Sequence, residues 1–360
     1  MAGIHVLDRV IGNEYPEFAT EADVRAFEQV PYRDRIAAES TYDAIKLAAA
    51  RTPDAPAIQF LPNADPSDQP IVMSYRDFVA RVTQAANMFH ALGVGPKDVV
   101  SFLLPLVPDA FVTLFGAEAA GIANPVNPLL EPYQIAEILE AARTTVLVAL
   151  GPMPGTDIWQ KVEKVRGQLK HLKAIVQVHG PGDPANGIHS FSELIKREPS
   201  DHFVSGRKIS GDEIAAYFHT GGTTGTPKLV RHTHANQVYQ AWGCNLILKS
   251  QAGTNLLFGM PLFHVGGSLT QVLTTLTAGS CLVVLACRLA KPGERQKHLE
   301  PGRTLQARSV FQRADDFGGG SQRAARQCRL IELAFRGGRR IRNPGRGRQR
   351  DPGQAQAACV

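Results

Sequence analysis

A stretch of glycine, threonine and lysine at residues 217–228 has the composition of a loop that binds phosphate groups. It reads Tyr-Phe-His-Thr-Gly-Gly-Thr-Thr-Gly-Thr-Pro-Lys. Glycine lets backbone amides approach an anion closely, threonine hydroxyls add hydrogen-bond donors, and lysine adds a mobile positive charge. The residue types therefore favour polyphosphate binding by Thr220, Gly221, Gly222, Thr223, Thr224, Gly225, Thr226 and Lys228.

The stretch also has two alternative interpretations. An arbitrary Gly/Thr segment between two strands is most often a polar hairpin turn. A Walker loop would need glycine directly before the lysine and serine or threonine directly after it. Pro227 and Leu229 occupy those places, which excludes the Walker pattern.

The stretch resembles the phosphate loop of the AMP-forming adenylating enzymes, which include acyl-CoA synthetases, luciferases and adenylation domains. Their loop reads roughly Tyr-Thr-Ser-Gly-Thr-Thr-Gly-x-Pro-Lys-Gly. The residues that match it in order are Thr220, Gly222, Thr223, Thr224, Gly225, Pro227 and Lys228. His219, Gly221 and Leu229 depart from it. The resemblance implies that this loop holds the β- and γ-phosphates of ATP.

A second segment, Met260-Pro-Leu-Phe-His-Val-Gly-Gly, resembles the Pro-Leu-Phe-His-x-x-Gly motif of the same family. Taken alone, a histidine after an aromatic residue is more often a core or cap residue than a functional one. In acyl-CoA synthetases the motif lines the acyl-binding channel. The resemblance therefore implies an acyl-channel role for Phe263, His264 and Gly267.

Metal ligation is not expected in this sequence. His232-Thr-His234 could place two imidazoles on one face of a strand, but no third ligand is nearby in the sequence. The five cysteines show neither paired nor metal-like spacing, which is typical of a reduced cytoplasmic protein. The N-terminal segment lacks the apolar run of a signal peptide, and no transmembrane segment is expected.

The elements that must position these motifs alternate between helix and strand. Helices are expected over residues 41–51, 74–92, 109–120, 133–143, 157–169 and 233–248. Strands are expected over residues 57–60, 71–73, 99–104, 145–150, 174–178, 213–218, 228–232 and 281–285. The strands are apolar runs with little alternation, which predicts a doubly wound, mostly parallel α/β fold. We expect a surface segment over 1–40 and an incomplete N-terminal domain of an adenylate-forming enzyme over 41–286.

Residues 287–360 have a different composition. They contain 17 Lys+Arg and 6 Asp+Glu, a net charge of +11, whereas residues 1–286 carry a net charge of −5. One interpretation is a basic arm that binds nucleic acid through phosphate charge. The other is a shifted reading frame: permitted codons for 288–319, read from the second base, can spell a periodic peptide that resembles the family's continuation. We favour the second interpretation and expect an irregular or disordered tail.

By resemblance the chain is an AMP-forming acyl-CoA synthetase that joins a carboxylic acid to CoA, with ATP and Mg²⁺ as cofactors. The implied partners are these small molecules; no specific nucleic acid is expected, and the oligomeric state stays open. The family's catalytic Glu, Asp, Arg and Lys motifs are not found in the sequence, so the catalytic residues are unknown and we expect an inactive, truncated chain. The alternatives are an aryl-acid or carrier-protein-loading ligase, a non-catalytic ATP-binding fragment, and a basic-tailed nucleic-acid binder.

Overall fold

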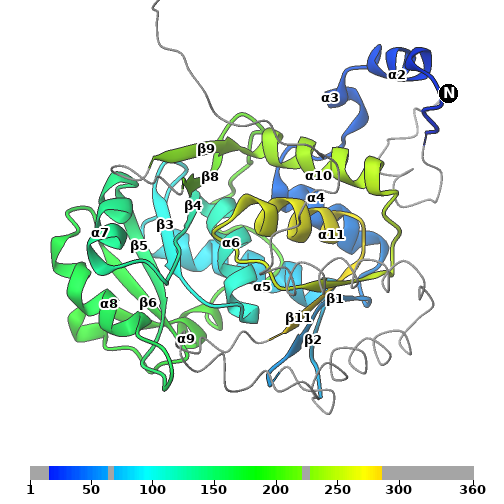
Figure 1. Cartoon of the computed structure of the whole chain (residues 1–360). Helices are drawn as coiled ribbons and strands as arrows, with labels where there is room; N and C mark the ends of the chain where they lie inside the picture. The colour runs from blue at the N-terminus through cyan, green and yellow to red at the C-terminus, as the bar shows by residue number, and fades with distance from the viewer. Residues whose placement is uncertain (1–15, 64–68, 221–227, 286–360) are drawn as a thin grey trace, which may run out of the picture. The chain divides into compact units, whose positions relative to one another are not determined.

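The computed structural model describes residues 16–63, 69–220 and 228–285, which all lie in one compact unit. Within these residues the chain forms two β-sheets, with helices between and outside them (Figure 1). Both sheets are mostly parallel, and strands alternate with helices along the chain. The predicted doubly wound α/β fold class is therefore confirmed.

The larger sheet has seven strands. Their spatial order is β7 (Ile188–Ser190), β6 (Ala174–Val178), β5 (Thr144–Leu150), β3 (Val99–Leu103), β4 (Ile122–Pro125), β8 (Ile214–His219) and β9 (Leu229–Thr233). Neighbouring strands run parallel, except for the antiparallel pair β8 and β9. Strands β3, β5 and β6 are buried along their whole length. Parallel sheets show this burial because helices cover both faces.

The smaller sheet has four strands, in the order β10 (Asn255–Phe258), β11 (Cys281–Leu285), β1 (Pro56–Leu61) and β2 (Ile71–Ser74). Strands β1 and β11 pair in parallel although they lie far apart in the sequence. Only β1 and β2 pair in antiparallel fashion among these four strands. This sheet therefore pairs the first described strand, β1, with the last one, β11.

Ten α-helices are described, with three other helical segments. They are α2 (Glu21–Glu28), α3 (Tyr32–Arg35), α4 (Thr41–Arg51), α5 (Tyr75–Ala91), α6 (Pro108–Ala120), α7 (Pro132–Ala141), α8 (Ile158–Val165), η1 (Arg166–Gln168), η2 (Pro184–Asn186), α9 (Phe191–Ile195), α10 (His234–Leu248), the π-helical η3 (Gly266–Leu273) and α11 (Thr274–Thr277). Helix α6 contacts strands of the larger sheet, and α5 contacts both α6 and the smaller sheet. Figure 1 shows α7 and α8 on the other side of the larger sheet.

Helix α6 is buried on all faces because it lies inside this layered arrangement. Every residue from Ala110 to Ala120 is buried. A helix without a polar face is typical of such a central position. At Gly116 an added Cβ would lie 2.5 Å from the Cβ of Ala85 on α5. Glycine is needed there because α5 and α6 approach so closely.

The predicted helix starts agree with the capping geometry. Ser74 accepts a hydrogen bond from the backbone N–H of Asp77 at 3.1 Å and begins α5. Thr233 accepts one from the N–H of Asn236 at 3.2 Å and begins α10. These side chains satisfy backbone donors that a helix leaves free in its first turn. Gly93 follows α5 with a φ of 82°, as expected for a glycine that ends a helix.

Short elements account for most differences from the sequence-based expectation. Strand β4 is absent from the expected strands because Asn124 and Pro125 have low strand propensity; its position between β3 and β8 overrides that local preference. The helix expected over 157–169 ends at Val165 and continues as the tighter turn η1. Strands β7 and β10 and helices α2, α3 and α9 were not anticipated.

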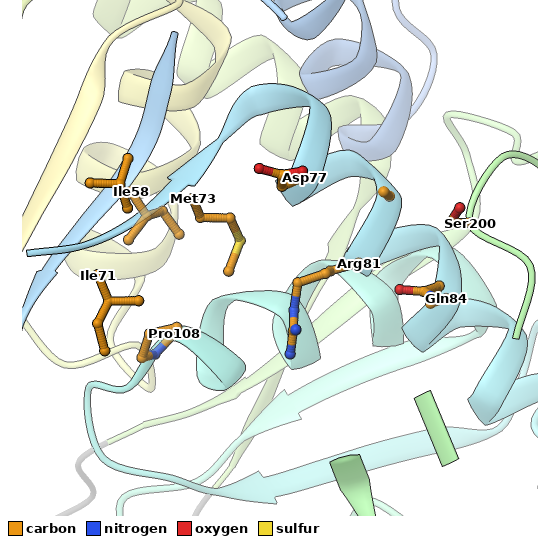
Figure 2. A pocket seen from close by; sticks show the side chains of 10 residues that line it. Ile58, Ile71, Met73, Asp77, Arg81, Gln84, Pro108 and Ser200 are labelled. Atoms are coloured by element: carbon orange, nitrogen blue, oxygen red, sulfur yellow. The ribbon is translucent and has the colours of Figure 1, made fainter. Parts of the chain in front are cut away.

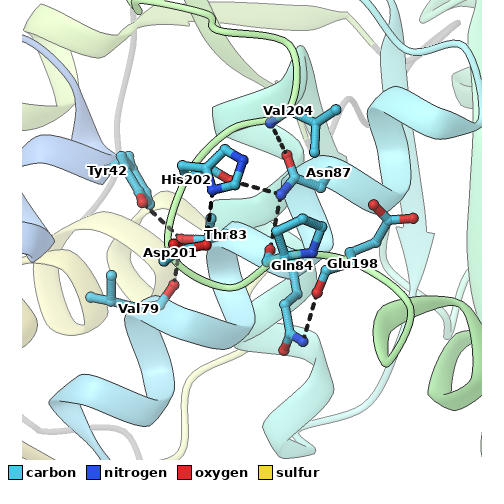
Figure 3. Close-up of polar contacts among 10 residues, drawn as sticks. Tyr42, Val79, Thr83, Gln84, Asn87, Glu198, Asp201, His202 and Val204 are labelled. Atoms are coloured by element: carbon cyan, nitrogen blue, oxygen red, sulfur yellow. Dashed lines mark hydrogen bonds and ion pairs between the residues drawn. The ribbon is translucent and has the colours of Figure 1, made fainter.

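A loop between α9 and β8 is attached to α5 by side-chain amides (Figure 3). The Nδ2 of Asn87 donates to the carbonyl oxygens of Pro199 and His202, each at 2.9 Å. Its Oδ1 accepts the N–H of Val204, also at 2.9 Å. Gln84, one turn earlier, donates to the carbonyl of Glu198 at 3.0 Å. These bonds fix the backbone that leads into β8 and toward the glycine-rich loop.

Candidate functional site

The hairpin of β8 and β9 brings the two ends of the glycine-rich loop together. His219 pairs with Leu229 in the strand register, and the N–H of Thr220 donates to the carbonyl of Lys228 at 2.9 Å. Both Thr220 and Lys228 are exposed. Gly221, Gly222, Thr223, Thr224, Gly225 and Thr226 lie outside the described residues, so their phosphate-binding role stays a prediction.

This hairpin end lies at the edge of the larger sheet where open α/β folds bind ligands. Strand β8 runs parallel to β4, and Ala216 pairs with Ala123. The residues that follow the two strands, Thr220 and Asn127, therefore lie at the same carboxyl edge. Ligands of doubly wound sheets bind outside this edge, since the loops there are free to vary. The position of the loop thus agrees with a binding function.

The segment containing Phe263 and His264 begins with a tight turn. His264 is exposed, and its Nδ1 accepts the N–H of Gly266 at 3.0 Å. Gly267 is buried, and an added Cβ would lie 2.3 Å from the carbonyl oxygen of Pro261. Only glycine fits that approach. The π-helical η3 begins at Gly266, and such segments are frequent at functional sites. The acyl-channel role of this segment stays a prediction.

His219 connects these two motifs. Its ring stacks on that of Phe263, with centroids 6.0 Å apart and planes 21° from parallel. Its Nε2 accepts the backbone N–H of Asn127 at 3.2 Å. Burial lowers the pKa of His219, so the imidazole is neutral at pH 7. From the sequence, His219 was noted only because it departs from the family's loop pattern, and its contacts were not predicted.

The neighbouring turn is held from a second side by a buried lysine. Lys161, on α8, donates from Nζ to the carbonyl of Pro128 at 2.9 Å. The same Nζ lies 3.3 Å from Oδ1 of Asp157. The turn that follows β4 is therefore fixed by His219 at one residue and by Lys161 at the next. A turn fixed in this way gives the sheet edge a defined shape.

His232 and His234 do not share one face of a strand, because they lie on different elements. His232 lies on β9, where its ring contacts Phe218 edge-on at 5.3 Å between centroids. His234 is the first residue of α10 and is buried. The N-cap at Thr233 turns the chain between the two. Among the described residues no group of three potential metal ligands occurs.

His234 belongs instead to a buried polar cluster behind α10, which we call the Thr41 cluster (Thr41, Glu118 and His234). The hydroxyl of Thr41 donates to Oε2 of Glu118 at 2.7 Å, and its backbone N–H donates to Nδ1 of His234 at 3.4 Å. Burial raises the pKa of Glu118 to about 7. Burial, with a contribution from the charge of Arg207, lowers the pKa of His234 to about 3. Sequence reasoning missed this cluster.

A hollow of about 460 Å³ lies elsewhere, between β2 and α5 (Figure 2). Ile58, Ile71 and Met73 form one side of it, and Arg81 and Gln84 lie on the other. Arg81 is already paired with Asp109 on α6, with Nη2 and Oδ1 2.8 Å apart. None of the sequence-predicted site residues lines this hollow. It is therefore separate from the loop at the end of β8.

Comparison with known proteins shows similarity to AMP-binding enzymes over most of the chain. The family described as AMP-binding enzyme matches residues 45–298, which extends beyond the break in composition near residue 287. Marinolic acid–CoA ligase of Pseudoalteromonas sp. is 34% identical over 270 residues, covering 73% of this chain and 40% of that protein. A crotonobetaine/carnitine–CoA ligase of Escherichia coli is 28% identical over 233 residues, covering 62% and 43% respectively.

Solved structures agree in fold. Anthranilate CoA ligase AuaEII in complex with anthranoyl-AMP has a TM-score of 0.62 at 22% identity, covering 72% of this chain and 47% of that one. A fatty acyl CoA synthetase from Mycobacterium tuberculosis has a TM-score of 0.56 at 21% identity, covering 69% and 45%. The chain thus spans less than half the length of these relatives. In the part of the chain that the structure describes, no helix combines the length and apolarity that crossing a membrane requires. By the extent of the family match and the identity to a CoA ligase, the chain belongs to the AMP-binding enzyme family.

Proposed function

We propose that the chain provides the nucleotide-binding part of an AMP-forming acid–CoA ligase. The observation that carries the proposal is the closed base of the β8–β9 hairpin. There, Thr220 and Lys228 meet at the ligand-binding edge of a parallel sheet. The family match and the similarity to acid–CoA ligases support the same function.

The proposed reaction has two steps. In the first, a carboxylate oxygen of the acid attacks the α-phosphorus of ATP; the bond to the bridging oxygen breaks, giving acyl-adenylate and pyrophosphate. In the second, the sulfur of CoA attacks the acyl carbonyl, and AMP leaves with the electron pair of the broken carbon–oxygen bond. Such chemistry depends on positioning and on stabilising the charge of the phosphates.

Each motif has a proposed part in the first step. The loop amides, the hydroxyls of Thr223 and Thr224 and the ammonium of Lys228 hold the β- and γ-phosphates. The segment with Phe263, His264 and Gly267 lines the path of the acid. The described residues offer no cluster of acidic side chains for Mg²⁺. A triphosphate supplies oxygen ligands of its own to that ion.

Lys228 gives the direct test of the proposal. We expect Lys228→Ala in the 360-residue chain to weaken ATP binding, measured by calorimetry, about tenfold to a hundredfold. The reason is that a charge-assisted phosphate contact is worth about 1.5–3 kcal/mol. Lys97→Ala is the matched control, because Lys97 is an exposed lysine just before β3, at the opposite edge of the sheet. Equal ATP affinity in the two variants would contradict the proposed role of the loop.

The acid is identified by a separate assay. Exchange of labelled pyrophosphate into ATP, run with aliphatic and aryl acids, reports the adenylation step and distinguishes an acyl-CoA synthetase from an aryl-acid ligase. The expectation that this chain does not turn over remains a prediction. Exchange above the rate without protein would contradict it.

A further inference from the structure

His219 contacts both the turn after β4 and the Phe263 segment, and it directly precedes Thr220, the first of the predicted phosphate-binding residues. It is the last residue of β8. One face of its ring lies on Phe263, and its Nε2 accepts the N–H of Asn127. Three segments from different parts of the chain therefore meet at one imidazole.

The contact with Asn127 fixes the chemical form of the ring. A backbone N–H can only donate, so Nε2 must carry a lone pair and the proton of the neutral ring must be on Nδ1. Protonation would place a second N–H against the N–H of Asn127 and abolish this bond. The stack on Phe263 tolerates either form, because a cation over an aromatic face is not repelled.

Other titratable groups surround His219 without pairing with it. Lys228 directly precedes β9, and Lys161 donates to the carbonyl of Pro128 in the turn. His264 is next to Phe263 but accepts the N–H of Gly266, and His232 contacts Phe218. Burial is the single cause that shifts the pKa of His219, and it favours the neutral form. No described charge competes with the bond to Asn127.

We propose that His219 is a positioning residue that, as the neutral imidazole, holds the Asn127 turn and the Phe263 segment in place beside the phosphate loop. This inference rests on the proposed function, since it ties nucleotide binding to the acyl segment. It predicts that nucleotide affinity depends on the protonation of a residue that does not touch the nucleotide. Acidification would release the Asn127 turn and loosen the sheet edge on which the loop is built.

The tautomer is the first measurable consequence. In the ¹⁵N-histidine spectrum of the 360-residue chain at pH 8, His219 should show a protonated Nδ1 and an unprotonated Nε2. His219→Gln identifies its signals by their disappearance. His232 is the internal comparison, because burial lowers its pKa in the same way but no hydrogen bond from a described residue fixes its tautomer. A proton on Nε2 of His219 would overturn the proposal.

The pH dependence of ATP affinity tests the positioning role. We expect ATP binding by the unchanged chain to weaken more steeply than binding by His219→Gln as the pH falls from 8. The difference should reach about two- to tenfold once the ring is protonated, which is the effect of losing one hydrogen bond. Glutamine keeps an acceptor for Asn127 but does not titrate. His219→Phe keeps a ring on Phe263 without an acceptor, so its affinity should be lowered by a similar factor at every pH. His232→Phe should follow the unchanged chain.

The outcomes separate this inference from the proposed function. Absence of ATP binding by the unchanged chain at pH 8 contradicts the proposed function, and the positioning role falls with it. ATP binding with the same pH dependence in the unchanged chain and in His219→Gln contradicts the positioning role alone. The titration of ATP itself cancels in this comparison, because it is common to all variants.

Discussion

Two histidines at opposite ends of one hairpin show how the same side chain serves different purposes. His219 ends β8 at the carboxyl edge of the larger sheet and is only partly buried, whereas His234 follows β9 and is fully buried. Burial lowers the pKa of both. His219 contacts two segments that carry predicted site residues, while His234 contacts the start of α4 in the core. The difference lies in the partners and in the depth of burial.

In the Thr41 cluster, the pH-dependent contributions of Glu118 and His234 to stability compensate each other. Glu118 has a pKa raised from 4.5 to about 7, so it adds stability below pH 4.5 that is lost as pH rises through 7. His234 has a pKa lowered from 6.5 to about 3, so it adds stability above pH 6.5 that is lost as pH falls through 3. Between pH 4.5 and 6.5 the two contributions change in opposite directions and cancel. His219 has no such counterpart among the described residues.

Removing one of the two groups should reveal the pH-dependent contribution of the other to stability, and this is the largest effect we predict. With Glu118→Gln, only the contribution of His234 remains within the cluster. The free energy of unfolding of this variant should fall by about 3 kcal/mol more than that of the unchanged chain when the pH is lowered from 6.5 to 4.5. The window spans about two pH units, and each unit corresponds to about 1.4 kcal/mol. Chemical denaturation of the 360-residue chain at these two pH values measures the difference.

Glu137→Gln is the control for that experiment, because Glu137 is exposed on α7. It should follow the unchanged chain at both pH values. A Glu118→Gln variant with the same pH dependence as the control would show that the two buried groups do not compensate each other.

The second prediction concerns the hydroxyl that joins the cluster. Thr41→Val keeps the shape of the side chain but removes the donor to Glu118, and we expect a loss of about 2 kcal/mol in stability. Thr113→Val is the matched control: Thr113 is also fully buried, but its hydroxyl has no hydrogen-bond partner among the described residues. Its replacement should be neutral or slightly stabilising. Equal losses in both variants would remove the special role of Thr41.

Local features of the fold were predictable because they depend on neighbouring residues. Ser74 and Thr233 cap helices through bonds that span three residues, and the apolar runs at β3 and β5 are continuous. The fold class follows from these elements. The pairing of β1 with β11 was not predictable, because no short-range pattern encodes a contact between strands so far apart. Strand β4 was missed for a similar reason: its place in the sheet outweighs Asn124 and Pro125.

For the candidate site, the sequence indicated which segments matter but not what joins them. Thr220, Lys228 and Phe263 were identified by motif, whereas His219 was noted only as a mismatch. Its importance comes from Asn127, which is distant in the sequence and contributes only a backbone N–H. The Thr41 cluster was missed because Glu118 and His234 are each ordinary in their local sequence. Their contact exists only after α4, α6 and α10 have packed together.

The smallest stability effect should come from the predicted site itself, at His264. Its side chain is exposed, and its one described hydrogen bond accepts the N–H of Gly266 two residues away. His264→Ala should therefore change the free energy of unfolding by less than about 1 kcal/mol, because an exposed local bond is easily replaced by water. If the segment lines the acyl path, ATP affinity should also stay unchanged while binding of the acid changes. Calorimetric titration with ATP, and with aliphatic acids of several chain lengths, separates the two effects. If His264→Ala instead lowered the stability as much as Thr41→Val and left the preference among the acids unchanged, His264 would be a structural residue like His234. Its predicted role in the acyl path would then be wrong.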